Sequence, residues 1–173
     1  MQLVDCTLAR HGEPILEILN DAIVSSTALY DYVPRPPEAM VTWFEAKKAG
    51  RYPVLGFEDE RGRLLGFASY GIFRAFPAYK YTVEHSVYVH RDERGRGLGP
   101  ALLRALIERA KEQQYHAMIA AIDVTNAPSI RLHQKLGFEH RGTLPAVGFK
   151  FGRWLDLAFY QLTLPTPETP ADG

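Results

Sequence analysis

The six residues Arg94-Gly95-Arg96-Gly97-Leu98-Gly99 constrain the fold of this chain more than any other segment. The residues before them are β-branched and aromatic, as in a strand, and the leucines after them recur at helical spacing. Glycines in a strand-to-helix turn let backbone N–H groups converge, and the helix N-terminus adds partial positive charge. We therefore expect an anion site, most naturally for phosphate, with charge added by Arg94 and Arg96. The structural alternative is a tight turn with surface arginines.

The turn lacks the motifs that bind two common phosphate ligands, ATP and NAD. A Walker A loop requires Gly-Lys-Ser/Thr, which does not follow here. A Rossmann fingerprint requires a glycine at position 100, which is Pro100, and an acidic residue at the end of a following strand. ATP and NAD are therefore disfavoured. Pro100 is expected at the first helical position, which leaves the other N–H groups available to a ligand.

Composition limits the classes of protein that this chain can belong to. It has 173 residues, of which 46 % are hydrophobic and 23 % charged, as in one globular domain. Its 20 basic and 20 acidic side chains give a formal net charge of +0, so neither nucleic acid nor a membrane is a predicted partner. The single Cys6 excludes an internal disulfide, and the longest aliphatic run, 117–122, is too short to cross a bilayer. A cytoplasmic location is expected.

Hydrophobic periodicity predicts one domain over residues 1–164 and a flexible C-terminal tail over 165–173. Residues 3–8 suggest an opening strand, and Pro14 suits the first turn of the helix after it. Pro37 can open a second helix, from which Lys47 is expected to point outward. Further strands are expected at residues 54–58, 64–70, 82–89, 117–123, 138–141 and 154–164, and further helices after residue 99 and at 126–136.

A second candidate binding segment follows one strand after the turn. Asn126-Ala127-Pro128-Ser129 opens a helix that ends before Gly137. Asn126 or Thr125 can cap this helix, which accounts for both residues without a ligand. The amide of Asn126 can also bind a ligand that lies between two parallel strands.

The two segments together resemble the GNAT family of N-acetyltransferases. Residues 94–99 are similar to its pyrophosphate-binding motif, and residues 126–129 and 136–138 are similar to its second coenzyme A segment. Residues 82–89 and 148–157 resemble signatures of the branch that acetylates phosphinothricin and methionine sulfoximine or sulfone. The resemblance extends from about Ile15 to Leu164.

The resemblance implies a mixed α/β fold: a mostly antiparallel sheet with one splayed pair of parallel strands, flanked by helices. Acetyl-CoA is implied as the co-substrate in the gap between those strands, and no metal is expected. A backbone N–H of Tyr88 or its neighbour is expected to stabilise the oxyanion. The implied cofactor-binding residues are Val87, Tyr88 and Val89 for the pantetheine arm, Arg94, Gly95, Arg96, Gly97, Leu98 and Gly99 for the pyrophosphate, and Asn126, Ser129 and Lys135 from the second segment.

The implied reaction transfers acetyl directly from a thioester to an amine. An ammonium group has no lone pair, so a base is required, and Glu84 occupies the position of the family's base. The structural alternative for Glu84 is an edge carboxylate in an ion pair. His133 stands where many relatives place the acid that protonates the leaving thiolate, and a satisfied helix histidine is its structural alternative.

The acceptor pocket is expected in the aromatic loop 71–81. The resemblance implies that Arg74 holds a carboxylate, that Phe76 and Tyr79 line the pocket, and that Lys150 completes it across a homodimer interface. The acceptor is then a small amino acid or a toxic analogue, and departures at Ile72-Phe73 leave phosphinothricin itself open. The alternatives are another amine, such as a polyamine, an aminoglycoside or a protein N-terminus, and an acyl-CoA-binding module without catalysis.

Overall fold

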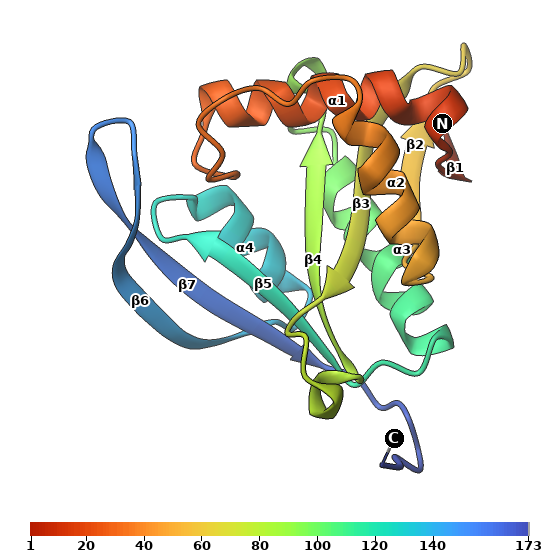
Figure 1. The fold of residues 1–173 in the computed structure, drawn as a ribbon, viewed down its shortest axis with the longest axis vertical. Coiled ribbons are helices and arrows are strands. Elements are labelled where there is room, and N and C mark those ends of the chain that lie inside the picture. Colours follow the sequence, from red (N-terminus) through yellow and green to blue (C-terminus); the bar gives the residue numbers. More distant parts are fainter. Residues whose placement is uncertain (173) are drawn as a thin grey trace. The chain divides into compact units, whose positions relative to one another are not determined.

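The computed structural model describes residues 1–172 and contains seven strands and four α-helices within them (Figure 1). Its elements in chain order are β1 (Gln2–Asp5), α1 (Leu8–Ser25), α2 (Ala39–Ala49), β2 (Val54–Glu58), β3 (Leu64–Ile72), β4 (Thr82–Val89), α3 (Leu98–Glu112), β5 (Ala117–Asp123), α4 (Ala127–Lys135), β6 (Glu139–Lys150) and β7 (Arg153–Thr163). The strands form one sheet in the order β1-β2-β3-β4-β5-β7-β6. Strands β4 and β5 are parallel, whereas the pairs β1–β2, β2–β3, β5–β7 and β6–β7 are antiparallel. The predicted fold class, a mostly antiparallel mixed sheet with helices, is confirmed.

Two compact units make up the described chain, and each is assembled from separate segments. The first contains Met1–Tyr70 and Ser86–Leu106, and the second contains Gly71–His85 and the chain from Ile107 onward. Strands β3 and β4 and helix α3 contribute residues to both units, and in β4 the division falls between His85 and Ser86. The single domain over residues 1–164 stays a prediction.

In the first unit, helix α1 begins earlier than the sequence suggested. The N–H of Thr7 donates to Nδ1 of His11 (2.9 Å), so the His11 proton sits on Nε2 and is donated to Oε1 of Glu58 (2.9 Å). His11 and Glu58 are both 3 % exposed, so this buried contact anchors the first turn of the helix. The prediction of a strand at Thr7-Leu8 is wrong, and Pro14 lies inside α1 rather than in its first turn.

The core of the first unit forms where the apolar faces of α1 and α2 meet strands β2 and β3. Its buried members are Ile15, Ile18, Leu19, Met40, Val54, Leu64 and Phe67. The prediction that Lys47 points outward is wrong, because its Nζ donates to the carbonyl of Tyr70 (2.7 Å) and lies 5.1 Å from the ring centroid of Trp43. Trp43 precedes Lys47 by one helical turn and offers a surface to its aliphatic stem. Burial lowers the pKa of Lys47 to about 8.

In the second unit, β5 pairs on both sides. Thr82, Val83 and Glu84 of β4 lie opposite Ala117, Met118 and Ile119, and β7 pairs with β5 over its whole length. The bounds of the 82–89 and 117–123 strands agree with the sequence prediction. β5 therefore fixes the first half of β4, which carries Glu84.

Strands β6 and β7 form a long hairpin in the second unit (Figure 1). Phe151 and Gly152 join them with positive φ angles of 52° and 72°, as a two-residue hairpin turn requires. The predicted strand at 138–141 is too short, because β6 continues to Lys150. Register shifts between His140 and Gly142 and between Leu144 and Gly148 interrupt the alternation that would reveal its length.

The C-terminal segment makes several hydrogen bonds within the second unit. His116 Nδ1 donates to the carbonyl of Thr166 (3.0 Å), and the N–H of Ala171 donates to the hydroxyl of Tyr81 (3.2 Å). Gly173 lies outside the described residues. The flexibility of the tail 165–173 stays a prediction. Among the described helices, none is both long enough and apolar enough to cross a membrane.

Candidate active site

The glycine turn lies in the first unit and exposes its backbone. Gly95 and Gly97 both have a φ of +78°, and a Cβ added at either would meet no described atom within 4 Å. Helix α3 begins at Leu98, so the expectation that Pro100 is its first residue is wrong by two positions. Pro100 still lies in the first turn, whose N–H groups have no intrahelical acceptor. Open space before this turn and a helix N-terminus fit the approach of a phosphate group.

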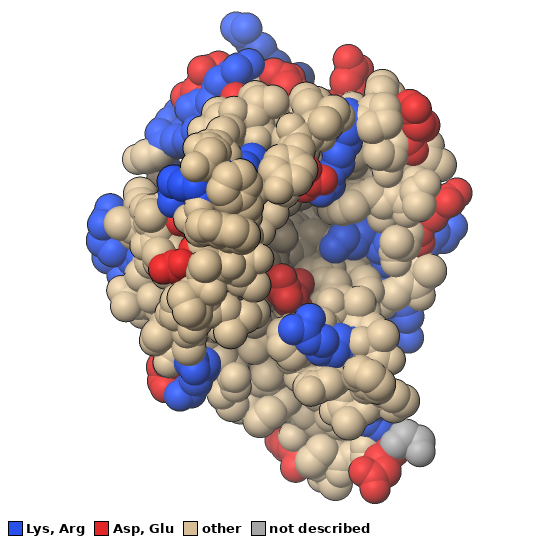
Figure 2. Space-filling model, turned by 60° about the vertical axis from the view of Figure 1, so that its left-hand side comes forward, with Lys and Arg blue, Asp and Glu red and all other residues tan. Residues whose placement is uncertain are grey.

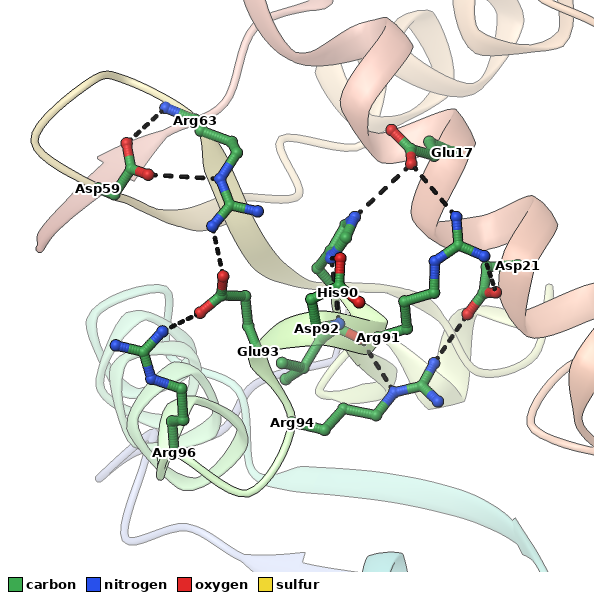
Figure 3. A network of polar contacts seen from close by, with 11 residues as sticks. Glu17, Asp21, Asp59, Arg63, His90, Arg91, Asp92, Glu93, Arg94 and Arg96 are labelled. Carbon is green, nitrogen blue, oxygen red and sulfur yellow. Dashed lines mark hydrogen bonds and ion pairs between the residues drawn. The ribbon is translucent and has the colours of Figure 1, made fainter.

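Both arginines of the turn pair with carboxylates of the same unit (Figure 3). Arg94 Nη2 lies 2.9 Å from Oδ2 of Asp21 in α1. Arg96 contacts Glu93, which is 4 % exposed and also contacts Arg63. The expected positive charge of the two arginines is therefore balanced within the unit. The backbone N–H groups of the turn are then the main partners that it offers to an anion, and the binding of a pyrophosphate there stays a prediction.

The second half of β4 is held against β3 within the first unit. The N–H of His90 donates to the carbonyl of Leu65 (2.9 Å), and the Tyr88 ring lies 5.5 Å from that of Phe67. A Cβ on Gly66 would lie 2.8 Å from the carbonyl oxygen of Tyr88, so only glycine allows this approach. Val87, Tyr88 and Val89 are half-buried, and their contacts with a pantetheine arm stay predictions.

Glu84 lies in the part of β4 that belongs to the second unit. It alternates with Val83 and His85, which are 0 % and 7 % exposed, and is itself half-buried on the other face of the strand. Burial raises the pKa of Glu84, and the positive charge of Arg74 partly offsets that rise. A carboxylate with a raised pKa is a more effective base near neutral pH.

The aromatic loop brings some of its predicted substrate residues together. The guanidinium carbon of Arg74 lies 4.8 Å from the ring centroid of Phe73, and Phe73 meets Tyr79 edge to face at 5.6 Å. Phe76 is 72 % exposed and Tyr79 41 %. The sequence prediction missed Phe73, although an aromatic residue next to an arginine is a recognisable signal for stacking. The positive charge of Arg74 acts on the pKa of Glu84 within the second unit, and their membership of one substrate site stays a prediction.

Helix α4 contributes the second candidate segment. Oδ1 of Asn126 accepts a hydrogen bond from the N–H of Ser129 (3.2 Å), which confirms its role as the helix cap. His133 is 6 % exposed, and both of its ring nitrogens have partners in the second unit. One partner is His85, which the sequence prediction did not include among the site residues. His85 follows Glu84 directly in the sequence, and this position is the signal that could have identified it. Lys135 is exposed in the last turn.

Lys150 lies at the end of β6, beside the hairpin turn. It is 3 % exposed, and its Nζ lies 4.9 Å from the ring centroid of Phe151. Its predicted contact with substrate stays a prediction. In residues 1–172, no three His, Cys, Asp or Glu side chains are grouped so that they could hold a metal ion.

Residues 16–138 match the acetyltransferase (GNAT) family. The chain belongs to this family. It is 52 % identical over 157 residues to an L-methionine sulfoximine/L-methionine sulfone acetyltransferase of Pseudomonas paraeruginosa, covering 90 % of this chain and 91 % of that protein. It is 37 % identical over 158 residues to a phosphinothricin N-acetyltransferase of Streptomyces viridochromogenes, covering 90 % and 85 %.

A solved structure of a GNAT phosphinothricin acetyltransferase from Sinorhizobium meliloti, in complex with acetyl-CoA, has the same fold. It superposes with a TM-score of 0.92 at 37 % identity and covers 98 % of this chain and 91 % of that one. This protein is therefore a GNAT N-acetyltransferase, and acetyl-CoA is its acetyl donor.

Proposed function

We propose that this enzyme acetylates the α-amino group of a small amino acid or of a toxic analogue, such as methionine sulfoximine, methionine sulfone or phosphinothricin. The observation that carries this proposal is the electrostatic link between Arg74 and Glu84 within the second unit. An α-amino acid presents a carboxylate and an ammonium, and these residues supply a cation for the first and a base for the second. The names of the relatives support the same acceptor class.

We assign the remaining roles as the resemblance to the GNAT family implies. Acetyl-CoA supplies the acetyl group as a thioester, and the turn from Arg94 to Gly99 binds its pyrophosphate. Glu84 takes the proton from the acceptor ammonium, so that the amine lone pair can attack. A backbone N–H at Tyr88 stabilises the oxyanion, and His133 supplies the proton for the leaving thiolate.

A polycationic acceptor is disfavoured by the loop that we assign to the acceptor. Residues 71–81 include Arg74 and Lys80 and no acidic residue. On the face in Figure 2, basic and acidic side chains are interspersed, in keeping with the formal net charge of +0. We therefore propose a small-molecule acceptor rather than nucleic acid or a membrane. A cytoplasmic location suits a chain whose single Cys6 has no second cysteine to oxidise with.

Replacing Arg74 tests the acceptor assignment. For methionine sulfone, Arg74→Gln is expected to lower kcat/KM roughly 10- to 100-fold, because a charge-assisted pair is lost. For the matching amine without a carboxylate, the same change is expected to have little effect. A coupled free-thiol assay with both acceptors measures this difference. Lys80→Gln is the matched control, and an equal loss on both acceptors contradicts the assignment.

Replacing Gly97 tests the phosphate site. Gly97→Val is expected to weaken acetyl-CoA binding at least tenfold, about 1.4 kcal/mol, because a branched side chain then fills the space before the backbone. Calorimetry gives the dissociation constant. Gly62→Val is the control for strain, since Gly62 has a similar φ of +77° in another turn of the same unit. Unchanged affinity in a folded Gly97→Val protein argues against the phosphate assignment.

We propose further that the enzyme is a homodimer formed through the β6–β7 hairpin. Phe149, Phe151 and Trp154 are 47 %, 58 % and 65 % exposed there, and large aromatic side chains are typical interface anchors. Phe151 also adopts a positive φ of 52°, which is rare for a bulky residue and holds its exposed ring at the tip of the hairpin.

The dimer has a direct test in solution. Light scattering at micromolar concentration is expected to give twice the chain mass of 19.5 kDa. Trp154→Glu is expected to shift the protein toward the monomer, because it places a charge in the proposed apolar contact. Tyr32→Glu, at an aromatic residue that is 71 % exposed in the first unit, is the control. A monomeric wild-type protein contradicts the proposal.

A further inference from the structure

Two histidines meet in the interior of the second unit, and the proposed reaction uses only one of them. His85 of β4 and His133 of α4 are 7 % and 6 % exposed, and their Nε2 atoms lie 3.0 Å apart. Both rings pack against Phe138, with centroid distances of 5.3 Å and 5.1 Å. The contact is therefore shielded from water and fixed by residues from three parts of the chain.

The other nitrogen of each ring faces a backbone carbonyl. Nδ1 of His85 lies 2.8 Å from the carbonyl oxygen of Ile119, and Nδ1 of His133 lies 2.7 Å from that of Ser129. A carbonyl oxygen only accepts hydrogen bonds. Each Nδ1 must therefore carry a hydrogen if its contact with the carbonyl is to be a hydrogen bond. The contact between the Nε2 atoms requires a hydrogen as well. Three hydrogens are thus needed for three contacts.

Two neutral imidazole rings carry only two N–H hydrogens. A third proton satisfies all three contacts, at the cost of one positive charge inside the unit. Burial opposes that charge and lowers the pKa of both His85 and His133. Repulsion from His133 lowers the pKa of His85 further, so a fourth proton is more strongly opposed. The pair therefore exchanges one proton between a neutral state and a singly charged state.

No other charged group controls this exchange among the described residues. Glu84 precedes His85 and lies on the opposite face of β4. The charged and titratable groups of the surrounding elements contribute to the pKa shift of neither ring. They are Asp123 in β5, Arg131 and Lys135 in α4, Glu139, His140, Arg141 and Lys150 in β6, and Arg153, Asp156 and Tyr160 in β7. The two rings, Phe138, two carbonyl groups and the Ser129 hydroxyl, which lies 3.4 Å from Nδ1 of His133, determine how tightly the proton is held.

We propose that His85 is a positioning residue for His133 and that the two rings bind one proton as a single unit. The hydrogen shared between the Nε2 atoms fixes the orientation of the His133 ring and determines when His133 carries a transferable proton. This inference rests on the proposed role of His133 as the acid. In that role the singly charged pair reacts, which is a minor form near neutral pH because burial opposes its charge. One of its N–H bonds breaks, the thiolate lone pair forms the S–H bond, and the pair becomes neutral. The proton released by the amine goes to Glu84.

Nitrogen-15 NMR of the histidine rings across a pH titration tests the shared proton directly. In the wild type, both rings are expected to titrate together in one step below the ordinary value of 6.5. His85→Asn removes Nε2 but leaves an amide N–H that can donate to the Ile119 carbonyl. In this variant, His133 loses the partner of its Nε2 while burial still opposes its charge, so its titration is expected to move further downward. His140→Asn, at an exposed histidine of β6, is the control.

Kinetics distinguish positioning from mere support of the fold. In His85→Asn, the pH at which kcat falls as His133 loses its proton is expected to move downward with the NMR midpoint, while acetyl-CoA affinity changes less than threefold. A purely structural His85 would lower kcat at every pH without moving that midpoint, which overturns the proposal. His85→Gln, which also lacks a titratable ring, replaces the asparagine variant if the latter does not fold.

The NMR result separates failure of this inference from failure of the proposed function. Independent titration of the two rings, or an unmoved His133 midpoint in His85→Asn, overturns the shared proton whatever the activity. If the two rings titrate together but the pH dependence of kcat does not change with their midpoint, the positioning role of His85 is overturned. Full activity in His133→Gln shows instead that His133 is not the acid, which is a failure of the proposed function.

Discussion

Glu84→Gln is expected to lower kcat by about 10²- to 10⁴-fold, because that is the usual contribution of a positioned base. The change preserves the size and hydrogen-bonding capacity of the side chain but removes its basicity. Acetyl-CoA affinity is expected to stay nearly the same. The free-thiol assay measures kcat, and calorimetry measures the affinity. Glu45→Gln, at an exposed position on α2, is the matched control.

The pH dependence of the variant is the sharper test of the same role. Raising the pH increases the fraction of acceptor that is already deprotonated, so Glu84→Gln is expected to recover activity relative to wild type. The wild type is expected to lose kcat/KM as the pH falls through the pKa of Glu84, which burial raises above its ordinary range. Normal turnover by the variant at neutral pH would make Glu84 structural. A rise in the acceptor KM alone would mean that Glu84 positions the amine.

The sequence predicts those strands, turns and helix caps that depend on residues close together in the chain. The strands at 82–89 and 117–123 have the predicted bounds, because their β-branched and apolar runs end at clear turn signals. The glycine turn and the cap at Asn126 are also local, since each depends on residues a few positions apart. The segments that carry the family resemblance are of this kind.

The sequence predictions are wrong or incomplete where the local structure depends on residues that are distant in the chain. The start of α1 depends on His11 and Glu58, which are 47 positions apart in the chain. The partner of His133 lies 48 positions away at His85, so no short motif contains the pair. Arg94 and Arg96 were correctly placed in the turn, but the carboxylate of Asp21 that balances Arg94 comes from α1. A sequence window identifies the residues of such a site and does not identify their partners.

Lowering the pH from 7 to 4.5 is expected to raise the unfolding equilibrium constant roughly 100-fold through His85 alone. Burial, with a smaller contribution from His133, lowers the pKa of His85 from 6.5 to about 3. A group whose pKa is lowered by folding binds its proton mainly in the unfolded chain, so stability is complete above 6.5 and is lost as the pH falls toward 3. Urea unfolding at a series of pH values measures this loss.

Other groups also titrate in this range, so the contribution of His85 must be isolated by comparison. His85→Asn is expected to be less stable than wild type at pH 7, because it gives up the contact with His133, but to lose less stability on acidification. The ratio of the two unfolding constants should therefore narrow as the pH falls from 6.5 toward 4.5. His140→Asn, which replaces an exposed histidine, should follow the wild-type curve. Parallel curves for wild type and His85→Asn would mean that the folded protein accommodates a charged His85, and that the buried pair does not resist protonation.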